Sequence, residues 1–182
     1  MYKDKDVEEI LISQDDLEKK TKEIAAQISG DFAGEEIVLI GVLRGGFIFI
    51  ADLSRQIPLR LTVDFIAVSS YGNSTKTSGV VKIIKDIDTD ITGKNVIIIE
   101  DLIDTGLTLK YLKELLHKRG PKEVKTCAIL DKPSRRETDI EADYKGIEIP
   151  DKFVVGYGLD YNGMYRNIPY VCTLKPEIYK KI

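Results

Sequence analysis

The chain has one histidine, two cysteines and no tryptophan. Cys127 and Cys172 are far apart and lie in apolar, strand-like runs, so we expect two buried free thiols. His117 falls near the end of an expected helix, where a surface position suits it. These scarcities leave little basis for a zinc site, a disulfide framework or Ser-His-Asp catalysis.

Other common signatures are also missing. Neither G-x-G-x-x-G nor G-x-x-x-x-G-K-[ST] occurs, so a dinucleotide site or a P-loop ATP site has little support. The net charge is −3, whereas a nucleic-acid-binding protein normally carries a basic excess. No apolar run is long enough to cross a bilayer, and no export signal is visible at the N-terminus. We therefore expect a cytoplasmic protein without nucleic-acid or membrane partners.

What the sequence does contain is an alternation of apolar strand-like runs with helical patterns, over 182 residues of which 43% are hydrophobic. This alternation predicts a single α/β domain in which a parallel twisted sheet is flanked by helices. Ser13 is expected to cap the first helix and Gly30 to end it, with further helices at 47–55 and 108–118. Expected strands cover 37–42, 61–69, 80–85, 96–99 and 124–130, with a turn at 41–46. The polar segment 71–79 is expected to be a mobile loop or a long hairpin connection.

The segment from Val96 to Thr108 is the most informative. A strand of valine and isoleucine leads directly into Glu100, Asp101 and Asp104, and a hydroxyl-rich turn then opens a helix. The unpaired N–H groups of a helix start favour an anion. Carboxylates beside such a turn suggest a ligand with hydroxyls or a bridging cation at one end and a phosphate at the other, as in a sugar phosphate. Taken without the turn, a solvated strand end and a capping aspartate explain the acids equally well.

Four candidate residues, Arg44, Asp101, Lys132 and Asp160, each follow an expected strand. Ligands of parallel α/β sheets bind at the carboxyl ends of the strands, so these side chains could converge on one site.

Four segments match a known family in order and spacing. They are Leu43-Arg44-Gly45-Gly46, Ser69-Ser70-Tyr71-Gly72, Glu100 to Thr108, and Ile149 to Asn162. The third resembles the phosphoribosyl-pyrophosphate signature of type I phosphoribosyltransferases. Together the four resemble the hypoxanthine-guanine branch of that family over nearly the whole chain.

The resemblance implies transfer of the 5-phosphoribosyl group from phosphoribosyl pyrophosphate to N9 of a 6-oxopurine base, hypoxanthine or guanine. The products would be IMP or GMP and pyrophosphate, with Mg²⁺ as the cofactor. It also implies one domain over 1–182, with a core at about 33–132 and a hood formed by about 1–12 and 133–182. Assembly as a homodimer or homotetramer is expected from the same resemblance.

In the ribose-phosphate region, the resemblance implies that Glu100 and Asp101 bind the ribose hydroxyls and orient Mg²⁺. Asp104 matches the family's general base or acid beside purine N7. The loop containing Asp104, Thr105, Gly106, Leu107 and Thr108 would wrap the 5′-phosphate. Leu107 stands where some relatives carry lysine, so no charged contact to the phosphate comes from it.

For the leaving group, the resemblance implies pyrophosphate binding by Arg44, Gly45 and Arg166. Arg44 occupies a position where many relatives have lysine, and the family's loop can contain a non-proline cis peptide before this residue. Ser70 and Tyr71 would belong to a lid that closes during catalysis.

For the base, Lys132 would donate to purine O6, which disfavours adenine because its amino group is itself a donor. Phe153 would stack on the purine, and the backbone of Val154 would read the base edge. Asp160 would make a water-mediated magnesium contact and offer its carbonyl to the 2-amino group of guanine. Arg135 and Arg136 are expected to be surface charges.

Other interpretations are compatible with the sequence. A sibling enzyme could prefer xanthine or accept only hypoxanthine. A regulatory protein could have kept this fold to sense phosphoribosyl pyrophosphate or nucleotides, and a general nucleotide-binding α/β domain is a third option. Without the resemblance, the 43–46 segment is interpreted as an ordinary glycine-rich turn and 69–79 as a flexible loop. Lys132 is then interpreted as a solvated side chain, and Phe153 and Val154 as core residues of a strand.

Overall fold

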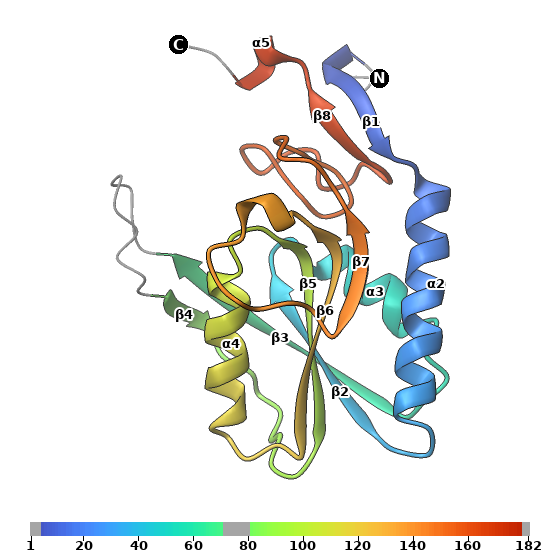
Figure 1. Ribbon diagram of the computed structural model, residues 1–182, viewed down its shortest axis with the longest axis vertical. Coiled ribbons are helices and arrows are strands. Elements are labelled where there is room, and N and C mark those ends of the chain that lie inside the picture. The colour runs from blue at the N-terminus through green and yellow to red at the C-terminus, as the bar shows by residue number, and fades with distance from the viewer. Residues whose placement is uncertain (1–4, 71–80, 180–182) are drawn as a thin grey trace.

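The computed structural model describes residues 5–70 and 81–179 (Figure 1). At its centre lies a six-stranded sheet in the order β4-β3-β2-β5-β6-β7. Only β3 and β4 pair antiparallel within this sheet, and the other neighbours are parallel. The expected α/β class is confirmed. The strands are β2 (Ile37–Leu43), β3 (Leu61–Ser70), β4 (Val81–Lys85), β5 (Asn95–Ile103), β6 (Glu123–Asp131) and β7 (Tyr144–Glu148).

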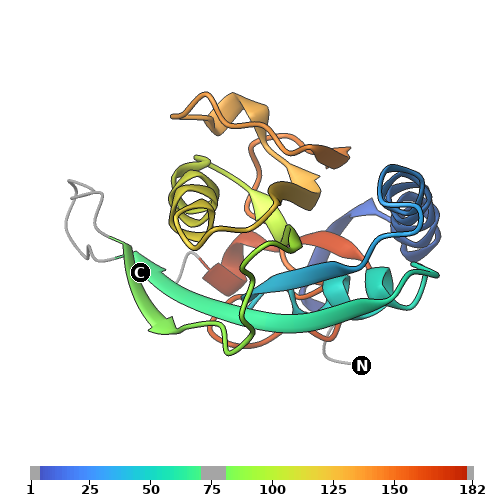
Figure 2. The ribbon, with the colours of Figure 1, turned by 90° about the horizontal axis from the view of Figure 1, so that it is seen from below.

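Helices cover both faces of this sheet (Figure 2). Because side chains alternate along a strand, Leu39 and Ile97 pack in the cluster under α2 and α3, whereas Ile40 and Ile98 pack in the cluster under α4. Burial on both faces explains why β2 and β5 are continuous apolar runs in the sequence. The helices are α2 (Gln14–Asp31), α3 (Phe47–Ser54) and α4 (Leu107–His117).

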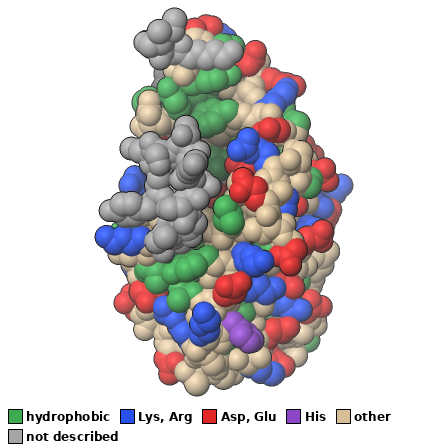
Figure 3. All heavy atoms as spheres, turned by 60° about the vertical axis from the view of Figure 1, so that its left-hand side comes forward, with side chains coloured by type: hydrophobic (Ala, Val, Ile, Leu, Met, Phe, Trp, Pro, Cys, Tyr) green, Lys and Arg blue, Asp and Glu red, His purple; other side chains and the backbone are tan. Residues whose placement is uncertain are grey.

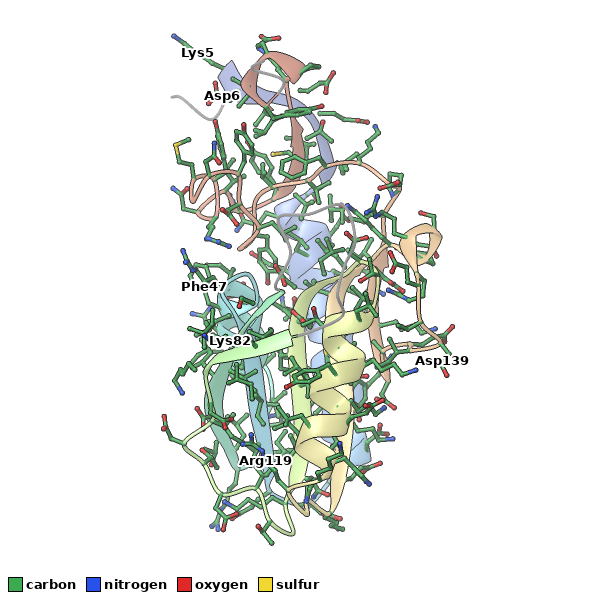
Figure 4. The ribbon with its side chains drawn as sticks, turned by 90° about the vertical axis from the view of Figure 1, so that its left-hand side faces the viewer. Lys5, Asp6, Phe47, Lys82, Arg119 and Asp139 are labelled. Carbon is green, nitrogen blue, oxygen red and sulfur yellow. The ribbon has the colours of Figure 1, made fainter. Side chains whose placement is uncertain are left out.

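A second, two-stranded sheet lies over the carboxyl ends of the main strands (Figures 1 and 4). It pairs β1 (Val7–Ile12) with β8 (Val171–Leu174), which is followed by α5 (Pro176–Tyr179). We call these ends of the chain, together with the turns of 149–170, the hood. The described part of the chain contains no helix that is both long enough and apolar enough to span a membrane.

The boundary of the hood differs from the expected one. The short 3₁₀ turn η1 (Pro133–Arg135) follows β6, but β7 then returns to the main sheet and pairs in parallel with β6. The sheet therefore extends beyond residue 132, the expected end of the core. The strand β7 is short and only Tyr144 in it is buried, so it gave no continuous apolar run in the sequence.

Several element boundaries also differ from the sequence-based expectations. Ser13 caps α2 as expected, since its Oγ accepts the N–H of Asp16 at 3.1 Å. Gly30 does not end this helix, because the buried face continues from Ile28 to the C-cap residue Phe32. Gly41 lies within β2 rather than in a turn, and a Cβ there would be 3.0 Å from side-chain atoms of the neighbouring residues Ile50 and Phe65.

The two cysteines and the histidine lie where the sequence predicted them. Cys127 and Cys172 are buried free thiols. His117 is exposed at the end of α4, and Figure 3 shows a single histidine side chain on that face.

One buried carboxylate outside the strand ends stabilises the sheet. Asp64 of β3 accepts backbone N–H groups of Phe65 at 2.6 Å and of Asp88 and Thr89 at 2.8 Å. Burial raises its pKa, but these donors outweigh that effect and lower the pKa to about 2. Asp64 thereby ties the loop after β4 to the sheet.

We predict that Asp64→Asn lowers the free energy of unfolding at pH 7 by about 2 kcal/mol, because each pKa unit corresponds to about 1.4 kcal/mol. The folded-state pKa is depressed, so this contribution is present above about pH 4 and is lost as the pH falls toward 2. Urea unfolding of the wild type and Asp64→Asn at pH 7 and pH 3 measures the difference in their free energies of unfolding, which should be smaller at pH 3. Asp88→Asn is the control, since that exposed carboxylate pairs only weakly with Lys85. A difference in the free energy of unfolding that does not depend on pH would contradict the assignment of this stability to the ionised Asp64 carboxylate.

Candidate active site

The carboxyl ends of β2, β5 and β6 meet beneath the hood (Figure 1). Ile103, the last residue of β5, pairs with Asp131, the last residue of β6. The carbonyl of Ile103 accepts the N–H of Lys132 at 2.9 Å. The structure therefore brings the acids of β5 and the lysine after β6 to one edge of the sheet. This is the edge where ligands of parallel α/β folds bind.

Two glycines let three segments meet at this edge. A Cβ at Gly45 would collide with the carboxylate of Asp101, and a Cβ at Gly158 would collide with the carbonyl of Gly45. The turn after β2 is thus pressed between the acidic end of β5 and the hood. The Leu43-Arg44 peptide in this turn is cis, and the side chain of Arg44 is exposed.

The acidic pair lies inside β5 rather than after it. The ladder between β5 and β6 continues through Glu100 to Ile103, four residues beyond the strand end that the apolar run predicted. Glu100 is only 7% exposed, and the side chain of Asp101 is partly exposed. The sequence-based boundary failed because charged residues rarely occupy a strand interior unless a site requires them.

Burial raises the pKa of Glu100 well above its usual range, and the neighbouring charge of Asp101 raises it further. Burial also raises the pKa of Asp101, although backbone N–H groups, Glu100 and the charge of Arg166 act in the opposite direction. Burial disfavours the charged forms of these two adjacent carboxylates, and a cation or hydroxyl donors would stabilise them. Their chemistry therefore suits a polyhydroxylated ligand that carries a metal ion.

The turn after β5 opens α4. Gly106 is the N-cap, with a left-handed φ of +84°, and the Oγ1 of Thr105 accepts the N–H of Leu107 at 3.4 Å. The alternative in which Asp104 caps the helix is therefore wrong. Thr105 and Thr108 flank Gly106, and Leu107 begins the helix with its side chain exposed. The first N–H groups of α4 have no partners within the helix, so the turn can accept an anion.

Asp104 contacts two arginines. Its carboxylate oxygen Oδ1 accepts Arg135 Nε at 2.8 Å, and its carbonyl accepts Arg136 Nη1 at 2.6 Å. Arg136 also pairs with Asp131, and its side chain is only 14% exposed. The expectation that Arg136 is a surface charge is wrong, because it packs against the turn at Gly106. A pair of arginines after a strand gave no sequence signal for this contact.

Lys132 and Phe153 form the neighbouring part of the site. Lys132 is 6% exposed, and its Nζ donates to the carbonyl of Lys152 at 2.7 Å. Phe153 is 48% exposed and has ring contacts with Tyr161 and Tyr179, at centroid distances of 5.9 and 5.7 Å. Val154 is buried. The structure therefore brings a buried cation from the end of β6 next to the hood segment that carries an exposed aromatic ring.

Asp160 and Arg166 form an ion pair at 2.6 Å within the hood. The other oxygen of Asp160 accepts the N–H of Gly163 at 2.7 Å, and Arg166 also donates to the carbonyl of Gly158 at 2.6 Å. Asp160 lies in a series of tight turns rather than after a strand, so that expectation is corrected. Positive φ angles at Gly156, Tyr157 and Gly158 mark these turns.

The expected lid can be placed only at its start. Ser70 is the last residue of β3, and Tyr71 lies outside the described residues together with the rest of the expected loop.

A mostly parallel sheet whose strand β5 carries an acidic pair near its carboxyl end, with a helix-start turn after that strand, places this protein in the type I phosphoribosyltransferase class. The Phosphoribosyl transferase domain model matches residues 7–162. The chain belongs to this family.

Characterised relatives are similar over nearly their full length. The hypoxanthine-guanine phosphoribosyltransferase of Bacillus subtilis (strain 168) is 52% identical over 175 residues, which cover 96% of this chain and 97% of the relative. A crystal structure of a hypoxanthine-guanine phosphoribosyltransferase from Bacillus anthracis is 53% identical, with a TM-score of 0.89 over 93% of this chain and 99% of that one. A hypoxanthine phosphoribosyltransferase structure from Staphylococcus aureus gives a TM-score of 0.95 at 46% identity, over 98% and 97% of the two chains.

We predict that Gly158→Ala disrupts the packing of the hood against the turn after β2 and the acidic end of β5. The left-handed φ of +100° and the collision with the Gly45 carbonyl should together cost more than about 2 kcal/mol of stability. Displacement of the turn at Gly45 should raise the KM for phosphoribosyl pyrophosphate about tenfold. Gly34→Ala is the matched control, because Gly34 has a φ of +80° but no neighbouring atom within 4 Å. Equal effects of the two substitutions on KM would refute this role of Gly158.

Proposed function

We propose that the protein transfers the 5-phosphoribosyl group from phosphoribosyl pyrophosphate to N9 of hypoxanthine or guanine. The bond from C1′ to the pyrophosphate oxygen breaks as the bond from C1′ to N9 forms, which gives IMP or GMP and pyrophosphate. The observation that carries this proposal is the acidic pair of Glu100 and Asp101 near the Gly106 turn, with the buried donor Lys132 directly after the neighbouring strand β6. The names of the relatives support the same purine bases.

The sugar is held by oxygen acceptors at one end and N–H donors at the other. Glu100 and Asp101 accept hydrogen bonds from the ribose 2′- and 3′-hydroxyls, and the backbone from Thr105 to Thr108 surrounds the 5′-phosphate. Arg44, Gly45 and Arg166 hold the pyrophosphate, with Arg166 already facing Asp101 closely enough to affect its pKa. These contacts fix C1′ so that the ribosyl cation-like state forms without reorganisation of the site.

The donor set fits Mg²⁺ as the cofactor. Within the described residues no cluster of three or more histidine, cysteine or acidic side chains could hold a metal ion. Mg²⁺ is commonly bound by one or two carboxylates together with phosphate oxygens and waters, and Glu100 and Asp101 supply two such carboxylates. Both oxygens of Asp160 already have partners, so Asp160 would support the ion through a water molecule. When bound, the ion neutralises charge on the departing pyrophosphate.

Base selection follows from the donor at Lys132. Its ammonium group donates to the 6-oxo group, while Phe153 stacks on the ring and the backbone at Val154 reads the base edge. The carbonyl of Asp160 accepts the 2-amino group of guanine. Asp104 takes the N7 proton as N9 bonds to C1′, which keeps charge from building up on the purine.

The assembly and location of the protein belong to the same proposal. A homodimer or homotetramer in the cytoplasm is the form expected of a salvage enzyme in this family.

We expect nucleotide formation from hypoxanthine and guanine, and none from adenine, when the protein is mixed with phosphoribosyl pyrophosphate and Mg²⁺. The donor at Lys132 would face the 6-amino group of adenine and find no acceptor there. Absorbance changes with each of four bases, including xanthine, measure the initial rates. Chelation by EDTA should abolish the reaction, and added Mg²⁺ should restore it. Turnover of adenine alone would remove Lys132 from base selection.

We expect Asp104→Asn to reduce kcat by about 10² to 10⁴, the range that general acid–base catalysis contributes. The amide keeps the shape of the carboxylate but cannot take the N7 proton. Asp139→Asn, at an exposed partner of Lys110, is the control that should leave kcat unchanged. If Asp104→Asn retained the wild-type kcat, Asp104 would have no role in proton transfer.

A further inference from the structure

Two consecutive arginines contact Asp104 at different points. Arg136 donates to its backbone carbonyl, and Arg135 donates to its carboxylate. Both arginines are positioned by the η1 turn, in which the N–H groups of Arg135 and Arg136 bond to the carbonyls of Lys132 and Pro133. The main chain and the side chain of Asp104 are thus held separately by one short turn.

Each arginine also pairs with the carboxylate of another residue. Arg136 pairs with Asp131, the residue before Lys132, and both side chains are less than one-fifth exposed. Arg135 lies 3.7 Å from Asp151, two residues before Phe153. The two ion pairs therefore connect Asp104 to the segments that carry the other proposed base-contacting residues.

We propose that Arg135 and Arg136 are positioning residues that fix Asp104 relative to the purine. This proposal rests on the proposed role of Asp104 in proton transfer. Arg136 sets the position of the backbone, and Arg135 restricts rotation of the carboxylate by holding one of its oxygens. The site would then meet the purine with its proton acceptor already oriented.

The two contacts differ in what they require of the side chain. Arg136 needs its planar fork, because its Nη1 donates to the Asp104 carbonyl while its Nη2 pairs with Asp131. A lysine has a single nitrogen and cannot reproduce this geometry. Arg135 is 46% exposed, and its ion pair with Asp104 contributes little to stability. Its loss should therefore change catalysis more than folding.

The test is steady-state kinetics of Arg135→Ala and Arg135→Lys with hypoxanthine and phosphoribosyl pyrophosphate. We expect Arg135→Ala to lower kcat about tenfold, to leave the KM for phosphoribosyl pyrophosphate within about twofold, and to leave the melting temperature unchanged. Arg135→Lys should restore part of kcat, because its ammonium group can still pair with Asp104. A kcat for Arg135→Ala equal to or above that of the wild type would overturn the proposal.

A double-mutant cycle separates positioning of Asp104 from other effects of the arginine. Arg135→Ala should cause no further loss of kcat in an Asp104→Asn background, since the oriented group is already gone. A tenfold loss in both backgrounds would show that Arg135 acts elsewhere. If Asp104→Asn alone were fully active, the proposed proton transfer would fail. If it were inactive while Arg135→Ala matched the wild type, only the positioning role would fail.

Arg136→Lys tests the backbone contact, and we expect a loss of kcat of about tenfold or more. Arg119→Lys is the matched control, because Arg119 pairs with Asp86 at 2.8 Å at the end of α4 remote from the site (Figure 4). It should have wild-type kinetics. A lowered melting temperature with unchanged kcat for Arg136→Lys would show that the contact of Arg136 with the Asp104 carbonyl supports folding only. The proposed positioning role of Arg136 would then be overturned.

Discussion

The close packing of the turn at Gly45 against Asp101 is the constraint that the rest of the site depends on. It brings a backbone loop and a desolvated carboxylate into contact, and Gly158 presses the hood onto the other side of the same loop. Any side chain at either glycine would separate the segments. The elevated pKa values of the acidic pair follow from this enclosure, because water that would stabilise both charges is excluded.

The sheet supplies the rigid support for this contact. Residues of β2 and β5 are buried on both faces, so the strands cannot shift without breaking two hydrophobic clusters. The functional groups stand at the ends of these strands, where the backbone is fixed by the ladder between β5 and β6 through Ile103. The hood adds the aromatic ring of Phe153 from a segment distant in sequence.

Much of this arrangement could be predicted from the sequence. Continuous apolar runs gave the parallel strands, and the acids after Ile99 with the following turn gave the centre of the site. What could not be predicted depends on tertiary contacts: the extension of β5 through Glu100, the return of β7 to the sheet, and the burial of Arg136. Local residue preferences place charged and mixed segments outside the core, and only the folded chain shows which of them have buried partners.

The hydrogen bond from Lys132 to the carbonyl of Lys152 bears on the proposed selection of the base. The main-chain oxygen satisfies part of the ammonium group, so the buried cation has an acceptor of its own. An arriving 6-oxo group would offer the same kind of acceptor, which makes the exchange nearly balanced in free energy. Binding strength would then come mainly from ring stacking. Discrimination would come from the free-energy cost of leaving the Lys132 ammonium group without an acceptor when the base has no oxygen at position 6.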